Sequence, residues 1–196
     1  MSHMTQFNEL LEESVKVHGH LCPGQVLGVR LSMSGLDRIG IHDPRGADRK
    51  KLIVYVEIDR CATDAIQSVT GCSPGKRSMK LMDYGKMAAT FVNLETGNAV
   101  RVLAKEESKG RAKNYFPEIE NKYQCQLEAY KIMPDDELFE YQDVEVIIPD
   151  KDMPGRPKRR VQCEKCSEHV QDSRDIEVDG ITLCKSCAGE AYYSLK

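Results

Sequence analysis

Two pairs of cysteines near the end of the chain constrain its fold more than any other feature of the sequence. Cys163 and Cys166 form one C-x-x-C pair, and Cys184 and Cys187 form the second. Each pair makes a knuckle on one side of a metal ion, and two knuckles at this spacing complete a closed tetrahedral zinc site. Because four thiolates leave no open position, this zinc is expected to be structural. A segment of about 35 residues cannot fold on apolar burial alone, which explains why it needs the metal.

The charge of the chain argues against nucleic acid as a partner. The formal net charge is −3 at pH 7, and the segment from Val161 onward carries more acidic than basic side chains. Phosphate binding relies on cationic side chains, so protein contact or dimer bracing is the expected role of the zinc segment. Positive charge does cluster just before it, at 158–160. A regulatory protein that contacts nucleic acid through this cluster and the zinc segment therefore stays as a third hypothesis.

A second concentration of metal-ligating side chains lies in the stretch His18-Gly19-His20-Leu21-Cys22-Pro23-Gly24. Neutral imidazole and thiolate suit zinc and related transition metals. Glycine admits backbone angles that other residues avoid, and proline disfavours helix at the residue before it, so Cys22 is expected in a fixed bend. The stretch predicts metal ligands at His18, His20 and Cys22. The alternative is a tight turn whose histidines are incidental.

Helical spacing predicts a helix that ends at His18. Apolar residues recur at this spacing from Phe7 onward. At about 100° per residue, the step from Phe7 to His18 returns to within about 20° of the same face. His18 should therefore point toward the protein, as a ligand or as a hydrogen-bonded core residue. A second helix is expected from about Gly24 to Arg38, where small residues leave room for another helix or a bound ligand.

Cys61 is expected where a strand turns into a helix. Leu52–Ile58 is dense in β-branched residues and long enough for a buried strand, and 62–69 has the pattern of a helix closed by Gly71. The free amides and the dipole of a helix N-terminus favour negative charge, which lowers the pKa of a thiol and makes it a better ligand or nucleophile. Cys61 is thus the strongest single candidate, the alternative being a buried, inert cysteine.

Cys72 is a weaker candidate for the same site. On one continuous helix Cys61 and Cys72 would share a face but stand about 16 Å apart along the axis, too far for one metal ion. Gly71 and Pro74 break the helix, so Cys72 would have to fold back or belong to a neighbouring site. The same stretch does not match a phosphate-binding loop, because Arg77 occupies the position that requires Ser or Thr.

The rest of the chain predicts an α+β fold. Strands are expected at 88–94, 99–104 and 144–148, and a helix at 119–130. On that helix Cys125 lies opposite the apolar stripe and is expected to be a surface thiol. Strands interleaved with helices give a mixed α/β core, followed by a small C-terminal zinc-knuckle domain. The expected domains are a core at 1–152, a linker at 153–160 with prolines and positive charge, and a four-cysteine zinc-binding domain at 161–196.

The cysteines and the lack of long apolar runs predict a reducing compartment. No apolar run approaches the roughly 20 residues that span a bilayer, and no signal-peptide core is visible. Eight cysteines would allow four disulfides, but the chain is long enough to fold without them, and its last cysteines form a metal pattern. The expectation is a cytoplasmic protein with reduced cysteines and no membrane association.

Three motifs together resemble the E-subunit family of formylmethanofuran dehydrogenase. They are the stretch His18–Gly24, a second at Asp59–Gln67 (DRCATDAIQ) and a third at Thr70–Lys76 (TGCSPGK). The resemblance covers the core to about residue 150, and a zinc knuckle of this kind also occurs in the family. It implies an α+β core with a Cys/His metal or active-site cavity, commonly a homodimer, and association with a molybdenum or tungsten enzyme. The chain itself has no pterin-cofactor machinery and no Cys-rich ferredoxin run.

The sequence therefore predicts a metal-binding protein with two unlike sites. Besides the structural zinc, a second transition metal ion, expected to be zinc, would be held by His18, Cys22 and Cys61, with His20 and Cys72 as further candidates. One position left open would allow Lewis-acid chemistry or water activation, with Cys61 and His18 as catalytic residues. Cys61 could also act as a nucleophile or a redox thiol. The alternative is a non-catalytic accessory subunit of a molybdenum or tungsten oxidoreductase.

Overall fold

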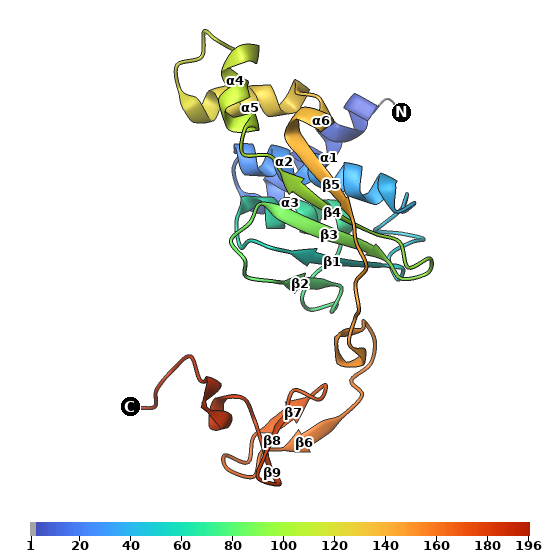
Figure 1. The fold of residues 1–196 in the computed structure, drawn as a ribbon, viewed down its shortest axis with the longest axis vertical. Helices are drawn as coiled ribbons and strands as arrows, with labels where there is room; N and C mark the ends of the chain where they lie inside the picture. Colours follow the sequence, from blue (N-terminus) through green and yellow to red (C-terminus); the bar gives the residue numbers. More distant parts are fainter. Residues whose placement is uncertain (1–2) are drawn as a thin grey trace. The chain divides into compact units, whose positions relative to one another are not determined.

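The larger of the two units of the protein is built on a five-stranded β-sheet with the strand order β2-β1-β3-β4-β5 (Figure 1). The computed structural model describes residues 3–196 in two units, one ending at Ile147 and one from Ile148 to Lys196. β1 and β2 pair in parallel, whereas the other neighbours pair antiparallel. The strands are β1 (Leu52–Val56), β2 (Met79–Leu81), β3 (Ala88–Asn93), β4 (Ala99–Ala104) and β5 (Phe139–Asp143).

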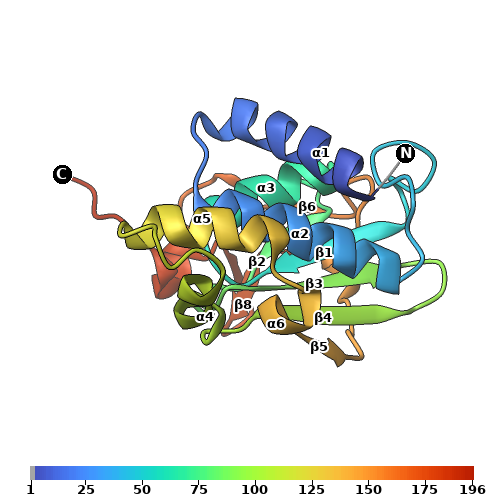
Figure 2. The same cartoon turned by 90° about the horizontal axis from the view of Figure 1, so that it is seen from above.

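Helices α1, α2 and α3 lie on one face of this sheet (Figure 2). α2 packs on β3 and β4, and α1 and α3 pack against α2. Gly35 allows the close approach of α2 to the sheet, because a Cβ at this position would overlap the ring of Phe91. The helices of the unit are α1 (His3–His18), α2 (Pro23–Arg38), α3 (Cys61–Thr70), α4 (Ser108–Tyr115), α5 (Lys122–Ile132) and the single turn α6 (Asp135–Leu138).

The fold class expected from the sequence is confirmed, with a mixed α/β core followed by a small C-terminal unit. In β1 only Tyr55 is not buried, which fits the β-branched run from which a buried strand was expected. β3 is buried throughout, and β4, which the chain joins to it through a turn at 94–98, is half buried and half partly exposed. The strands β3 and β4 lie at the centre of the sheet, where both neighbours are present.

Two expectations about the same unit are wrong. Residues 144–148 form no strand, and the last strand of the sheet is β5. The backbone N–H of Val144 still donates to the carbonyl of Ala99 at 3.2 Å, after which the chain leaves the sheet. Cys125 is buried, not exposed. Its thiol lies 3.5 Å from the carbonyl of Phe116, because α4, which the sequence did not indicate, packs against α5.

The second unit consists of short elements without an apolar core. Among its described residues only Cys163 and Cys184 are buried. Within the stretch expected as a linker, Lys158 pairs with Asp150 at 3.7 Å and Arg159 with Asp175 at 2.9 Å. The expected boundaries at 1–152, 153–160 and 161–196 stay a prediction. The elements are the 3₁₀ turn η1 (Asp150–Asp152), the hairpin β6 (Arg160–Gln162) and β7 (His169–Gln171), the hairpin β8 (Ile176–Val178) and β9 (Ile181–Leu183), and the helical turn η2 (Ser186–Glu190).

Two further features concern the whole described chain. Between residues 3 and 196 no helix combines the length and the apolar character needed to cross a membrane. The eight cysteines are free thiols, distributed over both units. Their positions relative to the histidines decide where a metal ion could be held.

Candidate metal sites

The loop between α1 and α2 brings two histidines and a cysteine together. Gly19 adopts a φ of +95°, a left-handed conformation open to glycine, and its N–H donates to the carbonyl of Val15 at 2.8 Å. Cys22 is extended (φ −145°, ψ 164°) and precedes the proline that begins α2. As a result, the ligand atoms of His18, His20 and Cys22 all lie within 4.8 Å of one another. Cys22 is off the helices, as expected from the sequence, but its backbone is extended and the chain bends at Gly19 and His20 instead.

Asp64 holds the ring of His18 from the neighbouring helix. Its Oδ2 lies 2.8 Å from Nδ1 of His18, which places the ring proton on Nδ1 and leaves the lone pair on Nε2. That Nε2 is buried and has no hydrogen-bond partner among the described residues. Metal-bound histidines typically donate their other ring N–H to a carboxylate. Asp64 was not singled out from the sequence, although its place one helical turn after Cys61 puts both on one side of α3.

Cys61 begins α3 beside this group. Gly24 lies between Cys22 and Cys61 and allows them to approach. A Cβ on Gly24 would lie 2.9 Å from Cβ of Cys61 and 3.7 Å from Sγ of Cys22. Cys61 is not one of the three residues whose ligand atoms are mutually within 4.8 Å. Burial and then the neighbouring Cys22 thiol raise the pKa of Cys61. The lowered pKa expected at a helix N-terminus is therefore wrong, because desolvation of the thiol and the Cys22 thiol outweigh the backbone hydrogen bond that lowers the pKa.

Cys72 lies at the opposite end of α3 from Cys61. The helix runs unbroken to Thr70, and Gly71 (φ +67°) turns the chain away from it. Cys72 is buried in the hydrophobic core, with its Sγ 4.0 Å from the carbonyl of Leu52 at the start of β1. Burial raises the pKa of this thiol. The structure thus does not bring Cys72 to the group of His18, His20 and Cys22.

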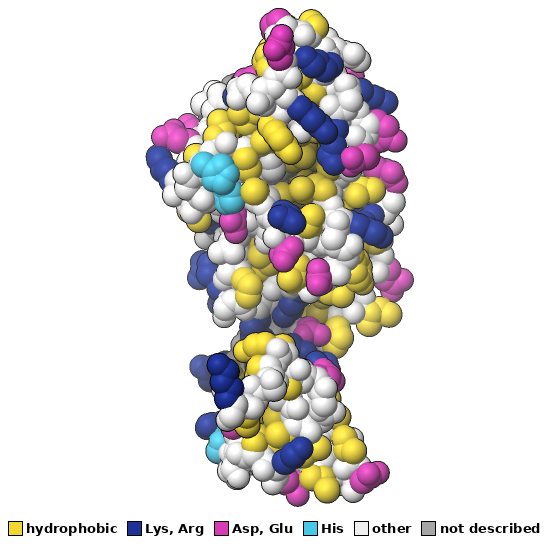
Figure 3. Space-filling model, turned by 90° about the vertical axis from the view of Figure 1, so that its left-hand side faces the viewer, with side chains coloured by type: hydrophobic (Ala, Val, Ile, Leu, Met, Phe, Trp, Pro, Cys, Tyr) yellow, Lys and Arg dark blue, Asp and Glu magenta, His cyan; other side chains and the backbone are white. Residues whose placement is uncertain are grey.

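A groove of about 510 Å³ opens beside Cys22, and none of its lining side chains is acidic or basic. Two of its residues, Leu21 and Tyr123, are apolar or aromatic and well exposed. Figure 3 shows histidine and hydrophobic side chains next to one another on the face of the first unit that carries the loop between α1 and α2. The groove is lined by Leu21, Cys22, Pro23, Asn121, Tyr123, Gln124 and Leu127.

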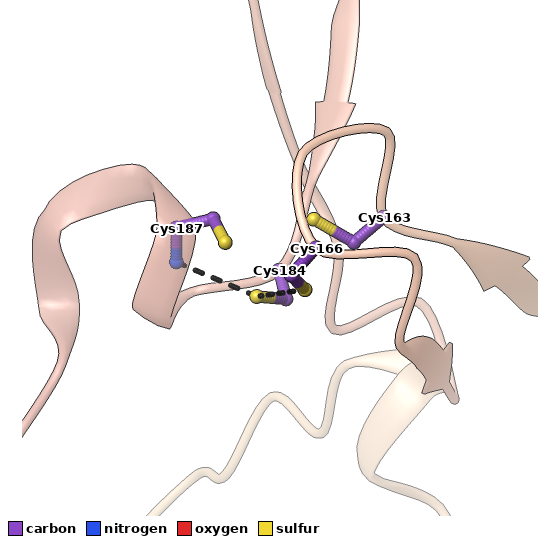
Figure 4. A group of neighbouring side chains, drawn as sticks. All are labelled: Cys163, Cys166, Cys184 and Cys187. Carbon is purple, nitrogen blue, oxygen red and sulfur yellow. Dashed lines mark hydrogen bonds between the residues drawn. The ribbon is translucent and has the colours of Figure 1, made fainter. Parts of the chain in front are cut away.

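The second candidate site is the group of Cys163, Cys166, Cys184 and Cys187, whose sulfur atoms face a common space (Figure 4). All four lie within 4.8 Å of one another, and the Cys166 and Cys184 sulfurs are 3.9 Å apart. Zinc–sulfur bonds of about 2.3 Å in a tetrahedron place sulfurs about 3.8 Å apart, so the Cys166–Cys184 separation matches a zinc site and the group as a whole is close to one. The backbone amides of Cys166 and Cys184 lower the pKa of Cys163 to about 6, whereas the neighbouring Cys184 thiol raises the pKa of Cys187 to about 12. Backbone donors of this kind stabilise thiolates, the form that binds metal.

An α+β core with a Cys/His group, followed by a four-cysteine unit, defines a protein with two places that could each hold a metal ion. The chain belongs to the FmdE family, since the family model described as "FmdE, Molybdenum formylmethanofuran dehydrogenase operon" matches residues 17–140. This range contains His18, His20, Cys22, Cys61 and Asp64 and ends before the four-cysteine group. The family resemblance expected from the sequence is confirmed.

Two relatives extend over nearly the whole chain. A protein of Archaeoglobus fulgidus, described as a probable S-adenosyl-L-methionine-binding protein, is 31% identical over 211 aligned residues, covering 96% of this chain. The match covers 55% of that protein, so the chain spans about half the length of this curated relative. A crystal structure of a tungsten formylmethanofuran dehydrogenase FmdE-like protein from Syntrophus aciditrophicus has a TM-score of 0.63 and 22% identity, covering 96% of this chain and 95% of that one. This structural similarity shows that the two proteins share a fold.

Proposed function

We propose that this protein is a metal-dependent enzyme whose core site holds a transition metal ion through His18, His20 and Cys22. The observation that carries the proposal is the state of His18, whose Nδ1 is bound to Asp64 while its buried Nε2 has no partner among the described residues. Leaving a buried ring nitrogen unsatisfied costs about 1–3 kcal/mol, and a metal ion at Nε2 removes that cost. The pairing of imidazole nitrogen with thiolate favours zinc.

Three protein ligands leave one coordination position for substrate or water. When bound, a zinc ion at such a site supplies a Lewis acid or a water of lowered pKa. Cys61 is the next thiol, on the side of Cys22, and in this proposal it faces the open position, as a nucleophile or as a fourth ligand that substrate or water displaces. His18, with its proton held at Nδ1 by Asp64, and Cys61 are the residues expected to carry the chemistry.

The groove beside Cys22 supports a small organic substrate. Apart from Cys22, which is a proposed metal ligand, its lining has no charged side chain, so the part of the groove away from the metal is suited to an uncharged molecular body. Two carboxamides, from Asn121 and Gln124, add polar contacts without net charge. The substrate class that fits is an uncharged organic molecule with one group that can approach the metal.

The four-cysteine group is proposed to hold a structural zinc ion. Four thiolates close the coordination sphere, and the unit around them buries only Cys163 and Cys184 among its described residues. A unit with so little buried apolar surface depends on its metal for folding.

Metal analysis of single-cysteine variants tests both assignments. The purified protein should hold two zinc ions per chain, measured by elemental analysis. Cys22→Ser should lose the core ion and Cys163→Ser the other one, because each removes a thiolate from a different group. Cys125→Ser, in a buried position outside both groups, should keep both ions. A core ion that stays bound in both Cys22→Ser and His18→Ala would overturn the proposed core site.

The second candidate function is an accessory subunit of a molybdenum or tungsten oxidoreductase. It is favoured by the family description, which names a molybdenum formylmethanofuran dehydrogenase operon. A stable complex with a purified formylmethanofuran dehydrogenase on size-exclusion chromatography would support it. A homodimer and a cytoplasmic location belong to the same proposal, and light scattering of the purified chain decides the oligomeric state.

A further inference from the structure

Two fully buried polar side chains connect the three helices that carry the core site. Ser14 on α1 and Gln25 on α2 are both 0% exposed. The Ser14 hydroxyl donates to Oε1 of Gln25, and Nε2 of Gln25 donates to the backbone carbonyl of Cys61 at 2.5 Å. The chain of contacts therefore runs from the helix that ends at His18, through the helix that follows Cys22, to the first residue of α3.

A carboxamide in this place needs a reason, because burying it costs free energy unless its hydrogen bonds are made. Because Gln25 is 0% exposed, its carboxamide depends on Ser14 and on the Cys61 carbonyl for its hydrogen bonds. The Cys61 carbonyl already faces the next turn of α3 as a hydrogen-bond acceptor, and helix formation does not require the extra bond from Gln25. Its specific effect is to connect the Cys61 backbone to α2.

The hydrogen bond from Gln25 can determine how α3 is positioned along α2. The two helices meet through Gly24 and Gly28, and a Cβ on Gly28 would lie 2.6 Å from the carbonyl of Ala62. Glycine brings the two backbones close and supplies no side chain of its own to this contact. A directional hydrogen bond at the first turn of α3 fixes where Cys61 lies along α2.

We propose that Ser14 and Gln25 form a positioning relay that holds Cys61 beside His18 and Cys22. The inference rests on the proposed function, since it concerns the metal site proposed there. Neither relay side chain belongs to the ligand group, so both are positioning residues and not catalytic ones. They act on the site through the Cys61 backbone.

Replacing Gln25 by methionine tests the relay, because it removes both hydrogen bonds while keeping a similar volume. Cobalt(II) bound at the core site is the probe, with the four-cysteine site first filled with zinc. Gln25→Met should lower core cobalt affinity by about ten- to hundredfold, as outer-shell changes at metal sites do. The visible spectrum of the bound cobalt should also change, a readout that a loss of stability alone does not produce.

Gln126 offers a matched control on α5. It is buried at 6% exposure, and its Nε2 has no hydrogen-bond partner among the described residues. Gln126→Met should leave both the cobalt affinity and the spectrum at wild-type values. An equal loss of affinity in Gln25→Met and Gln126→Met would overturn the relay, as would wild-type affinity and spectrum in Gln25→Met.

Ser14→Ala keeps the experiment decisive if Gln25→Met does not fold. It leaves the bond from Gln25 to Cys61 but frees the carboxamide to rotate, so a loss of about threefold or more in cobalt affinity is expected. Folded Ser14→Ala with wild-type affinity and spectrum would contradict the relay. If the wild-type protein binds cobalt at the core, such a result removes the relay alone; if it binds none, the proposed function fails as well.

Discussion

Asp64 determines which nitrogen of His18 can bind a metal ion. The 2.8 Å contact between its Oδ2 and Nδ1 of His18 keeps the proton on Nδ1. Asp64→Asn retains the shape of the side chain but removes its charge. We expect core-site zinc affinity to fall about ten- to hundredfold, as measured by competition with a chromophoric chelator. Asp37→Asn, at an exposed position in α2, is the control. A similar loss in that variant would mean that only net charge matters.

His18, His20 and Cys22 could be identified from the sequence because they lie in one bent segment, where local geometry alone brings them together. Asp64 could not, since its contact with His18 joins residues 46 positions apart. Local reasoning also predicted a lowered pKa for Cys61 from its place at a helix N-terminus. Burial, which depends on the packing of other elements, acts in the opposite direction and is the larger effect.

At the scale of elements, α2 and α3 approach so closely at Gly28 that a side chain does not fit. A Cβ there would lie 2.6 Å from the carbonyl of Ala62 and 2.7 Å from Cβ of Ala65. Gly28→Ala should lower the free energy of unfolding by about 1–3 kcal/mol, measured by urea denaturation. Gly110→Ala in α4 meets nothing within 4 Å and should be neutral or stabilise by up to about 1 kcal/mol. Equal stabilities of the two variants would contradict the close contact.

The start of α5 forms one wall of the groove beside Cys22, with Tyr123 at 70% exposure. The cobalt-loaded protein should bind 4-phenylimidazole at least about tenfold more tightly than imidazole, because the phenyl ring covers apolar surface there. Titration followed by visible absorption measures both affinities. Tyr123→Ala should remove most of the preference, whereas Tyr84→Ala, which changes an exposed tyrosine outside the groove lining, should keep it. Equal affinities for the two imidazoles would show that the groove does not contribute.

Patterns in the sequence located the central strands better than the edges of the sheet. β1 and β3 are almost wholly buried and carry the apolar, β-branched residues that mark such strands. β5 is an edge strand in which only Phe139 is buried and several residues are polar, so its pattern is weak. Residues 144–148 have a composition more typical of a strand than β5 has. Beyond Val144, however, they form no β-sheet hydrogen bonds with a neighbouring strand. Strand formation depends on pairing, which composition does not encode.

Each of the two units is stabilised in a different way. The unit ending at Ile147 has a continuous hydrophobic core, whereas the unit from Ile148 onward buries only two of its described residues, both cysteines. The four-cysteine group could be predicted because each C-x-x-C pair carries its ligands locally. In the basic stretch before it, Lys158 and Arg159 form ion pairs with acidic side chains of the same unit. Their charge is thus partly neutralised, which weakens the case for phosphate binding there.

Removing metal from the full chain should therefore unfold residues 148–196 while the first unit stays folded. With excess chelator, trypsin should cut at Lys165, Arg174 and Lys185 at least about tenfold faster, because the segment loses the interaction that orders it. The fragment that contains residues 3–147 should persist, as identified by mass spectrometry. Cys163→Ser should show the same pattern without chelator, and Cys22→Ser, which alters only the core group, should not. If the second unit of Cys163→Ser resists trypsin as wild type does, its two hairpins hold their fold without the ion, and the zinc there is not structural.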